Sequence, residues 1–408
     1  MIATDPLLVA GVVIASFVAY NVGGSTTGPA FGPAVGAGVI GKVAAGALMS
    51  VCFFAGAFTI GRRVVETLGT DLLREPGVFT PEASILVLAF IGGALFLGNL
   101  SGTPASTSMT AVGAIAGLGL AAEQLDWAVV GEILLWWIVS PVAGFWLSVV
   151  VGRYFYARIE HAIAIDGSAG PLVRIDRSGR LPRPVPGPDT TRREIAGSAA
   201  VVAIGCLMAF SSGTSNIANA IAPLVGSGAI DMTPGILIGS AAVAVGAFTI
   251  ARRTMDTLGN DITDLPLTAA LVVAVISSTI VVGLSAMGVP ASFVVIATTS
   301  IVGLGWGRAS RTFTVAEAVA GETSPSVSVG ALRADDDPPT VGDPTRETER
   351  SAPEAIGDAD PADVPAAVEL FDPRTSIRVI LVQNLVPILA TVGSFLTFSL
   401  LFGGVWPV

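Results

Sequence analysis

Long apolar runs recur along this chain, at about 6–22, 41–61, 82–100, 128–152, 195–212, 233–251, 266–288 and 376–403. A helix needs about 20 apolar residues to cross a bilayer, and backbone in lipid must satisfy its hydrogen bonds internally. Only 13% of the residues are charged, against about 25% in an ordinary soluble domain. The sequence therefore predicts an all-α, multi-pass protein of the cytoplasmic membrane with about 10–12 membrane segments.

The two halves of the chain repeat one unit. "GAFTIGRRVVETLGTDL" (56–72) returns as "GAFTIARRTMDTLGNDI" (246–262), and "GGSTTGPAFGPAVGAGVI" (23–40) as "GTSNIANAIAPLVGSGAI" (213–230), both at an offset of 190. Two further pairs keep this order, 103–119 with 289–305 and 134–150 with 380–396. A repeat of this kind indicates an internal duplication, and duplicated membrane halves are commonly inverted. We expect two inverted structural repeats.

The repeats divide the chain into five regions. We expect a first membrane repeat at 1–152, an Arg-rich cytoplasmic linker at 153–194, the first part of a second repeat at 195–308, an acidic Pro/Ala-rich disordered insert at 309–375 and a final membrane segment at 376–408. The arginines place the linker in the cytoplasm. The insert has too few apolar residues to fold by itself.

Each half also contains two short polar segments, at 24–40 and 104–120 in the first half, rich in Gly, Pro, Ser and Thr. Close helix packing explains the glycines but not the hydroxyls, amides and helix-breaking prolines. Such segments at matching positions indicate a transporter binding site. We expect broken or re-entrant half-helices that meet at the midplane. Inverted halves must cross the membrane an odd number of times, so we expect about five crossings in each.

These motifs resemble those of the inorganic phosphate transporter (PiT) family. "VGGSTTGPAFGPAVGAGVI" and "FSSGTSNIANAIAPLVGSG" are similar to its duplicated signature, approximately G-A-N-D-V-A-N-[AS]-[FI]-G-[TP]. "RRVVETLG", "RRTMDTLG", "TPASTSM", "VPASFVV" and "WWIVSP" also match in the family's order. The resemblance implies a secondary active permease that moves inorganic phosphate by alternating access, coupled to sodium or protons, with no other cofactor. The lipid bilayer is its environment, and a homodimer is compatible with the sequence.

Carried over by position, the resemblance assigns substrate binding to hydroxyl and amide side chains. These are Ser25, Thr26, Thr27, Ser106, Thr107, Ser108, Ser215, Asn216, Asn219 and Ser292. N–H groups at the N-termini of broken helices would add donors for an oxyanion. The candidates for the coupling-ion site are Glu66, Asp256, Asn216 and Asn219.

Both signature aspartates are replaced, by Thr26 and Asn216, and Pro29 stands where the second copy keeps Asn219. A carboxylate could ligate sodium, or accept a hydrogen bond from protonated phosphate; hydroxyl and amide oxygens ligate sodium more weakly. Sulfate carries no proton at neutral pH, so loss of this acceptor weakens discrimination against it. A sulfate or other oxyanion permease is therefore one alternative, and a degenerate transporter-like sensor is another.

Paired arginines follow two of the apolar runs: Arg62 and Arg63, and Arg252 and Arg253. They could hold an oxyanion through bidentate hydrogen bonds. Cations are also favoured at helix C-termini and at the membrane interface, and Glu66 could pair with Arg62 at a spacing of four. The sequence favours this structural role.

Other classes of protein fit poorly. A net charge of −10 without a basic stripe argues against nucleic acid. Cys52 and Cys206 lie in apolar runs, where no disulfide is indicated, and the single histidine, His161, lies in a charged loop. No catalytic pair or metal motif appears, so we expect neither an enzyme nor a metal site. A channel would repeat one pore residue, whereas the two halves differ at nearly every polar position.

Overall fold

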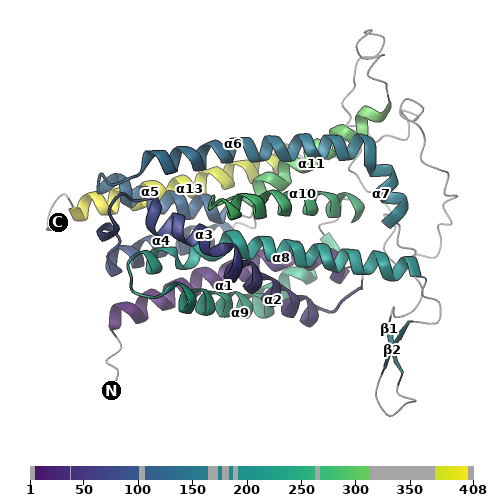
Figure 1. Ribbon diagram of the computed structural model, residues 1–408, viewed down its shortest axis with the longest axis horizontal. Helices are drawn as coiled ribbons and strands as arrows, with labels where there is room; N and C mark the ends of the chain where they lie inside the picture. The colour runs from purple at the N-terminus through teal and green to yellow at the C-terminus, as the bar shows by residue number, and fades with distance from the viewer. Residues whose placement is uncertain are drawn as a thin grey trace, which may run out of the picture.

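Helices make up almost all of the described chain. The computed structural model describes residues 5–36, 38–100, 106–163, 173–176, 183–186, 192–261, 267–312 and 373–402. Its helices form an elongated bundle (Figure 1). The long ones are α1 (Pro6–Gly36), α2 (Lys42–Thr59), α4 (Pro81–Leu100), α5 (Thr107–Ala121), α6 (Trp127–Val150), α8 (Arg192–Gly226), α9 (Met232–Asp261), α10 (Leu267–Ala286), α11 (Phe293–Ala309) and α13 (Pro373–Phe402).

Short elements connect them. These are α3 (Gly61–Glu66), the π-helical turn η1 (Thr67–Asp71), η2 (Pro76–Val78), a second π-helical turn η3 (Val151–Phe155), α7 (Tyr156–Ile163) and η4 (Ser310–Thr312). Two strands, β1 (Val173–Asp176) and β2 (Arg183–Pro186), pair antiparallel within the linker. This small hairpin is the departure from the all-α prediction. Most of the acidic insert, residues 313–372, lies outside the described residues.

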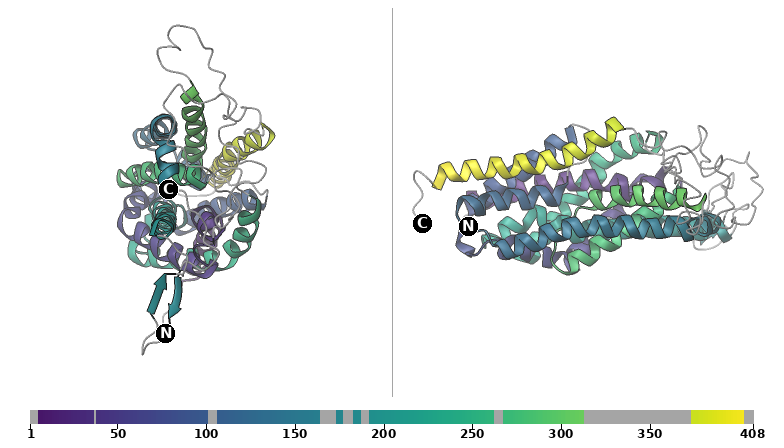
Figure 2. Two further views of the ribbon diagram at one scale, coloured as in Figure 1. Left: turned by 90° about the vertical axis from the view of Figure 1, so that its right-hand side faces the viewer. Right: turned by 90° about the horizontal axis from the view of Figure 1, so that it is seen from above.

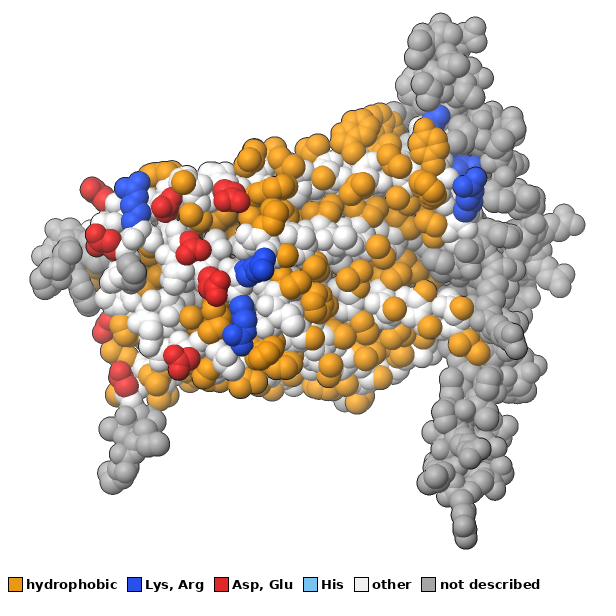
Figure 3. Space-filling model, viewed as in Figure 1, with side chains coloured by type: hydrophobic (Ala, Val, Ile, Leu, Met, Phe, Trp, Pro, Cys, Tyr) orange, Lys and Arg blue, Asp and Glu red, His pale blue; other side chains and the backbone are white. Residues whose placement is uncertain are grey.

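The multi-pass membrane prediction is confirmed. Seven described helices are long and apolar enough to cross a membrane, and three shorter apolar helices accompany them, which agrees with the predicted 10–12 segments. Apolar side chains cover the middle of the face shown in Figure 3. Ile138 on α6 and Leu400 on α13 are 68% and 80% exposed. An apolar exterior of this kind is the surface that lipid requires.

The sequence predicts that the polar segments at 23–36 and 213–226 are separate half-helices, and this prediction is wrong. Each is the C-terminal part of one long helix, α1 or α8, although Pro29, Pro33 and Pro223 lie inside these helices. Membrane helices tolerate proline because hydroxyl side chains and neighbouring helices satisfy the backbone groups that it frees. The fall in hydropathy therefore marks a change in what the helix faces, and not a break in it.

The short segment at 104–120 does re-enter. Its helix α5 follows α4, and the residues that flank this pair meet: the Arg74 N–H donates to the Gln124 carbonyl at 2.8 Å, and the Asp126 N–H donates to the Leu72 carbonyl at 3.0 Å. The chain thus enters and leaves the α4–α5 hairpin at one end of the bundle.

Helices α10 and α11 form the corresponding hairpin of the second half. Ala269, near the start of α10, and Leu304, near the end of α11, share a buried cluster with Tyr156. In Figure 1 this hairpin lies toward the right and α4–α5 toward the left. Each half therefore contributes three long helices and one hairpin. The prediction of five crossings in each half is wrong, because each hairpin enters and leaves at one end of the bundle and so adds no crossing. The three long helices leave an odd number of crossings in each half.

Contacts between the halves occur in matching pairs. At four positions in two helix crossings, a Cβ added to a glycine would lie only 2.0 to 2.2 Å from a backbone carbonyl oxygen of the facing helix. The pairs are Gly23 with Val243, Gly213 with Phe53, Gly56 with Phe210 and Gly246 with Tyr20. Adding or subtracting the offset of 190 converts each pair into another. The α1–α9 and α2–α8 interfaces are thus built from equivalent residues.

The two ends of the bundle differ in charge. Helix α1 begins and α13 ends at the same end (Figures 1 and 2), and acidic side chains gather there in Figure 3. The opposite end carries Arg153, whose Nη1 donates to the Ser310 carbonyl, and Arg308, which lies 4.1 Å above the Tyr156 ring. The positive-inside rule assigns the arginine-bearing end to the cytoplasm.

We expect Gly213→Ala to lower the melting temperature of the detergent-solubilised protein. The new Cβ would lie 2.0 Å from the Phe53 carbonyl oxygen and force α2 and α8 apart. Gly131→Ala is the matched control, because Gly131 is exposed on α6 and its added Cβ meets nothing within 4 Å. Thermal unfolding of both variants checks this, and equal melting temperatures would contradict the close crossing.

Candidate functional site

A buried polar cluster lies where the N-terminus of α5, the middle of α8 and the turn between α10 and α11 meet. The Ser108 hydroxyl on α5 donates to the Ala291 carbonyl at 3.0 Å. The Ser215 hydroxyl on α8 donates to the same carbonyl at 2.8 Å. The two hydroxyl oxygens are 3.1 Å apart. One carbonyl of the second hairpin thus joins both helices at a site closed to solvent.

Asn216 connects this cluster to its neighbours. Its Oδ1 accepts from the Thr107 hydroxyl at 2.5 Å and from the Asn219 Nδ2 at 3.2 Å, while its own Nδ2 donates to the Ser212 hydroxyl at 3.0 Å. Asn219 is fully buried, and its Oδ1 has no hydrogen-bond partner among the described residues. Every side chain in this network is neutral. It has several donors and one unused buried acceptor.

Ser106 and Ser292, which the sequence predicts to bind substrate, cap the N-termini of α5 and α11 in the structure. The Ser106 hydroxyl accepts from the Met109 N–H at 3.3 Å at the start of α5. The Ser292 hydroxyl accepts from the Val295 N–H at 3.5 Å at the start of α11. Capping satisfies one of the free N–H groups of a helix N-terminus. The others remain available to an anion, so these serines contribute by fixing the helix ends.

The first signature copy stays apart from this network. Ser25 and Thr26 donate to the Val22 carbonyl at 3.2 and 2.7 Å, and Thr27 donates to the Gly23 carbonyl at 2.6 Å. All three hydroxyls therefore satisfy the backbone of their own helix. The structure brings together Thr107, Ser108, Ser215, Asn216 and Asn219, and the hydrogen bonds of this group do not include the first copy.

The repeat-related counterpart of the cluster is an apolar cavity. Pro29 and Phe293 stand at the positions equivalent to Asn219 and Thr107. Together with Pro33 and residues of α8 and α10 they line a cavity of about 200 Å³. The two halves are thus equivalent in backbone but not in chemistry, because only one of the two related positions is polar.

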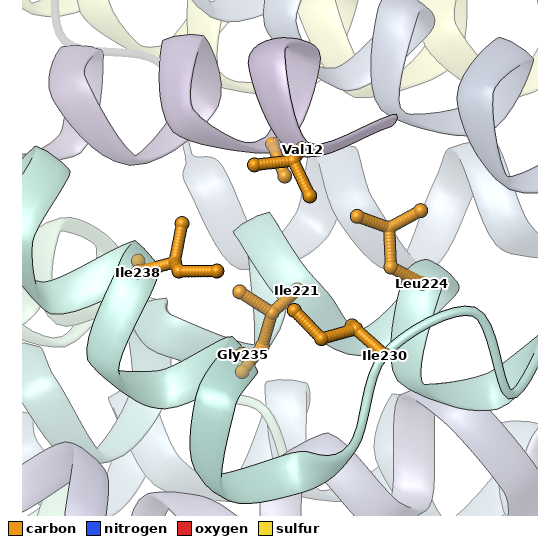
Figure 4. A pocket seen from close by; sticks show the side chains of 8 residues that line it. Val12, Ile221, Leu224, Ile230, Gly235 and Ile238 are labelled. Atoms are coloured by element: carbon orange, nitrogen blue, oxygen red, sulfur yellow. The ribbon is translucent and has the colours of Figure 1, made fainter. Parts of the chain in front are cut away.

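A second void lies between α1, α8 and α9. Figure 4 shows its lining, with Val12 from α1 and Ile221 and Leu224 from α8 among the side chains that converge there. Its volume is about 10 Å³ and its lining side chains are apolar. Because an unpaired charge in such a space is costly, this void is a packing defect and not an anion site.

The paired arginines have structural partners. The Arg62 guanidinium donates to the Phe58 carbonyl and to the Thr233 hydroxyl, both at 2.9 Å, and lies 4.5 Å from the centre of the Phe58 ring. Arg63 donates through Nη1 to the Ala286 carbonyl at the C-terminus of α10. Both satisfy helix backbone, as the structural interpretation predicts.

Of the two charged coupling candidates, Glu66 is the one whose side chain the structure describes. The Glu66 side chain is exposed on α3, and no hydrogen bond or ion pair joins it to Arg62 or to the cluster in the described structure. The side chains of Asp256, Arg252 and Arg253 lie outside the described residues. Asn216 and Asn219 are the coupling candidates that the structure places in the polar cluster.

Sequence reasoning missed the Ala291 carbonyl and the Ser212 hydroxyl. A backbone carbonyl leaves no trace in residue type, although Ala291 directly precedes a serine in the "VPAS" motif. Ser212 lies one helical turn before Asn216, so the helical period could have revealed it.

The oxygen ligands of the cluster fit a hard cation better than a transition metal. They are hydroxyl, amide and carbonyl oxygens. Within the described residues, no group of three or more His, Cys, Asp or Glu side chains could hold a metal ion. Cys52 and Cys206 are free thiols, as the sequence predicts.

Two hairpins from opposite ends, long flanking helices and a buried polar cluster at the hairpin tips define the fold of a secondary transporter. The chain belongs to the phosphate transporter family, whose model matches residues 22–329.

Relatives in this family carry two kinds of name. The chain is 30% identical over 301 residues to the sulfate permease CysP of Bacillus subtilis, covering 73% of this chain and 77% of that protein. It is 25% identical over 363 residues to a protein of Pyrococcus furiosus named "Putative phosphate permease", covering 74% and 88%.

A solved structure has the same fold. It is titled "The sodium-dependent phosphate transporter", with a TM-score of 0.65 and 17% identity, and the match covers 98% of this chain and all of that chain. At this identity the likeness concerns the fold alone.

Proposed function

We propose that this protein is a secondary active permease that moves inorganic phosphate across the cytoplasmic membrane by alternating access, coupled to sodium or protons. The observation that carries the proposal is the buried neutral cluster of Thr107, Ser108, Ser215, Asn216 and Asn219 at the hairpin tips. Membership of the phosphate transporter family supports the substrate, as do the relatives named as phosphate permeases.

The cluster holds an oxyanion by redirecting hydrogen bonds that it already makes. The hydroxyls of Thr107, Ser108 and Ser215 now donate to neutral oxygens of the protein. An anionic oxygen is a stronger acceptor, so these hydroxyls turn toward it. The Asn219 amide and the first N–H groups of α5 supply further donors.

The same rearrangement explains coupling to a cation. When the hydroxyls and the Asn219 amide N–H turn toward the anion, the Asn216 Oδ1 and the Ala291 carbonyl lose their donors. The buried Asn219 Oδ1 lacks a partner from the start. Three neutral oxygens are then available to a sodium ion, which prefers oxygen ligands, beside the negative charge that it balances. Binding of sodium or of the anion thereby favours binding of the other. Coupling to protons would require a titratable group in place of the sodium ion.

Alternating access follows from the duplicated construction. We propose that the repeats are inverted about an axis in the membrane plane, in keeping with the matched glycine contacts and the opposed hairpins. The cavity beside Pro29 and Phe293 then belongs to one access route. Its counterpart beside Asn219 and Thr107 is packed here and opens in the alternate state.

Sulfate is the second candidate substrate. The described cluster contains no carboxylate, so no built-in acceptor distinguishes a protonated phosphate from a proton-free sulfate. The 30% identity to a sulfate permease points in the same direction. A sensor that has lost transport would bind the oxyanion without moving it, and counterflow of labelled substrate distinguishes the two.

We expect Asn219→Ala or Ser215→Ala to abolish phosphate uptake and to leave membrane insertion intact. Both side chains are buried in the cluster and supply hydrogen bonds that an oxyanion requires. Uptake of labelled phosphate and sulfate into proteoliposomes, with and without sodium and proton gradients, tests this and identifies the driving ion. Ser50→Ala is the control, because that hydroxyl donates to the Gly46 carbonyl of its own helix. Wild-type uptake by both variants would contradict the site.

We expect Asn216→Asp to raise the ratio of phosphate to sulfate uptake by about tenfold. A carboxylate repels a proton-free dianion but accepts a hydrogen bond from the P–OH group of phosphate, and a hydrogen bond to a charged group contributes about 1.5–3 kcal/mol. Competition between the two labelled anions measures the ratio, with Asn216→Ser as the uncharged control. An unchanged or lower ratio would show that position 216 does not select the substrate.

A further inference from the structure

The turn between α10 and α11 is held through its carbonyl oxygens by side chains of the first repeat. The donors come from three separate elements, α3, α6 and α5. They are Arg63 to Ala286, Trp137 to Pro290 at 2.7 Å and Ser108 to Ala291 at 3.0 Å. The carbonyl groups at the tip of the second hairpin therefore depend on the opposite half of the protein for hydrogen-bond donors.

The tip requires external donors because its own backbone supplies few. The last carbonyls of a helix have no partner within it. Gly288 turns the chain with φ +83°, and a Cβ there would lie 2.7 Å from the Thr67 hydroxyl, so the turn is both left-handed and closely packed. Pro290 has no N–H to offer. The carbonyls of Pro290 and Ala291 are thus left to side chains of other helices.

Trp137 acts on the peptide that adjoins the polar cluster. Its indole Nε1–H donates to the Pro290 carbonyl, which shares a peptide plane with the Ala291 nitrogen. Ala291 then presents its carbonyl to Ser108 and Ser215, and Ser292 caps α11 directly afterwards. Fixing this peptide plane restrains Ala291, whose own carbonyl, in the next peptide plane, enters the cluster just before α11 begins.

The two tryptophans of the "WWIVSP" motif have different roles. Both are half-buried on α6. Trp137 packs against the main core and makes the hydrogen bond, whereas Trp136 packs against the hairpin's own apolar cluster and has no described hydrogen bond. The repeat-equivalent position of Trp137 is Gln383, which is buried and also bears an N–H donor. The Gln383 Nε2 has no hydrogen-bond partner among the described residues, so of these two related positions Trp137 is the one that bonds to a hairpin turn.

We propose that Trp137 is a positioning residue for the oxyanion site, which acts by holding the Pro290 carbonyl so that the second hairpin tip stays aligned with α5 and α8. It does not itself touch the bound anion. The effect of Trp137 on transport rests on the proposed function, but its effect on the position of the hairpin tip does not. Loss of the indole N–H frees the tip, which weakens substrate binding and exposes the turn, while the packing of α6 stays in place.

The test compares Trp137→Phe with Trp136→Phe. Each removes one indole N–H and keeps an aromatic ring on the same helix. The first readout is the rate at which a membrane-impermeant maleimide labels Val289→Cys, a tip position that is 3% exposed, in a background of Cys52→Ala and Cys206→Ala. The second readout is the KM and maximal rate of phosphate and sulfate uptake without the added cysteine.

We expect Trp137→Phe to raise the labelling rate about fivefold and KM by a similar factor, the effect of one lost hydrogen bond, with the maximal rate within twofold of the parent. Trp136→Phe trims packing beside the cluster that contains Val289 but removes no described hydrogen bond, so it should raise labelling less than Trp137→Phe does and leave KM at the parent value. Trp137→Gln, which keeps an N–H donor, should give a labelling rate and a KM between those of Trp137→Phe and the parent.

Equal labelling rates in Trp137→Phe and Trp136→Phe would overturn the positioning role, whether both rates exceed that of the parent or both equal it. A fall in maximal rate with unchanged KM and labelling would overturn it as well. If the parent transports neither anion, the proposed function fails, and the labelling comparison still decides the role of Trp137.

Discussion

The Ala291 carbonyl joins the two halves of this protein at the polar cluster. It accepts hydrogen bonds from Ser108 of the first hairpin and from Ser215 of α8, in a region where lipid surrounds the bundle and buried polar groups depend on protein partners. Each donor sits on a helix whose position is set by interfaces between the halves, such as the glycine crossings of α2 with α8. The polar cluster can therefore keep its geometry only while both repeats are docked.

The neutrality of the cluster defines the chemistry that it can perform. Asn216 occupies the signature's aspartate position, and its oxygen is already engaged by Thr107 and Asn219. A neutral site repels neither a divalent nor a monovalent oxyanion. In the proposed function, such a site discriminates by shape and hydrogen bonding, and a bound cation balances the charge of the anion.

Much of this architecture could be predicted from the sequence, because lipid imposes length and hydropathy on each helix and duplication leaves matching motifs. The polar residues of the second copy were also identified. The sequence could not predict that α1 continues through Pro29 and Pro33, because the groups that satisfy the backbone carbonyls freed by these prolines are distant in sequence. For the same reason, sequence could not show that Ser25 and Thr26 bond to their own helix, or that Ala291 contributes a carbonyl.

In the proposed function, the oxyanion binds at the junction of α5, α8 and the α10–α11 turn. Crystals of the protein grown with selenate or arsenate test it directly, since selenium and arsenic can both be located by anomalous scattering. The account predicts an anomalous peak within hydrogen-bonding distance of Thr107, Ser108 and Asn219. A peak in the apolar cavity beside Pro29 and Phe293, or beside Arg62 and Arg63, with none at the cluster, would contradict it.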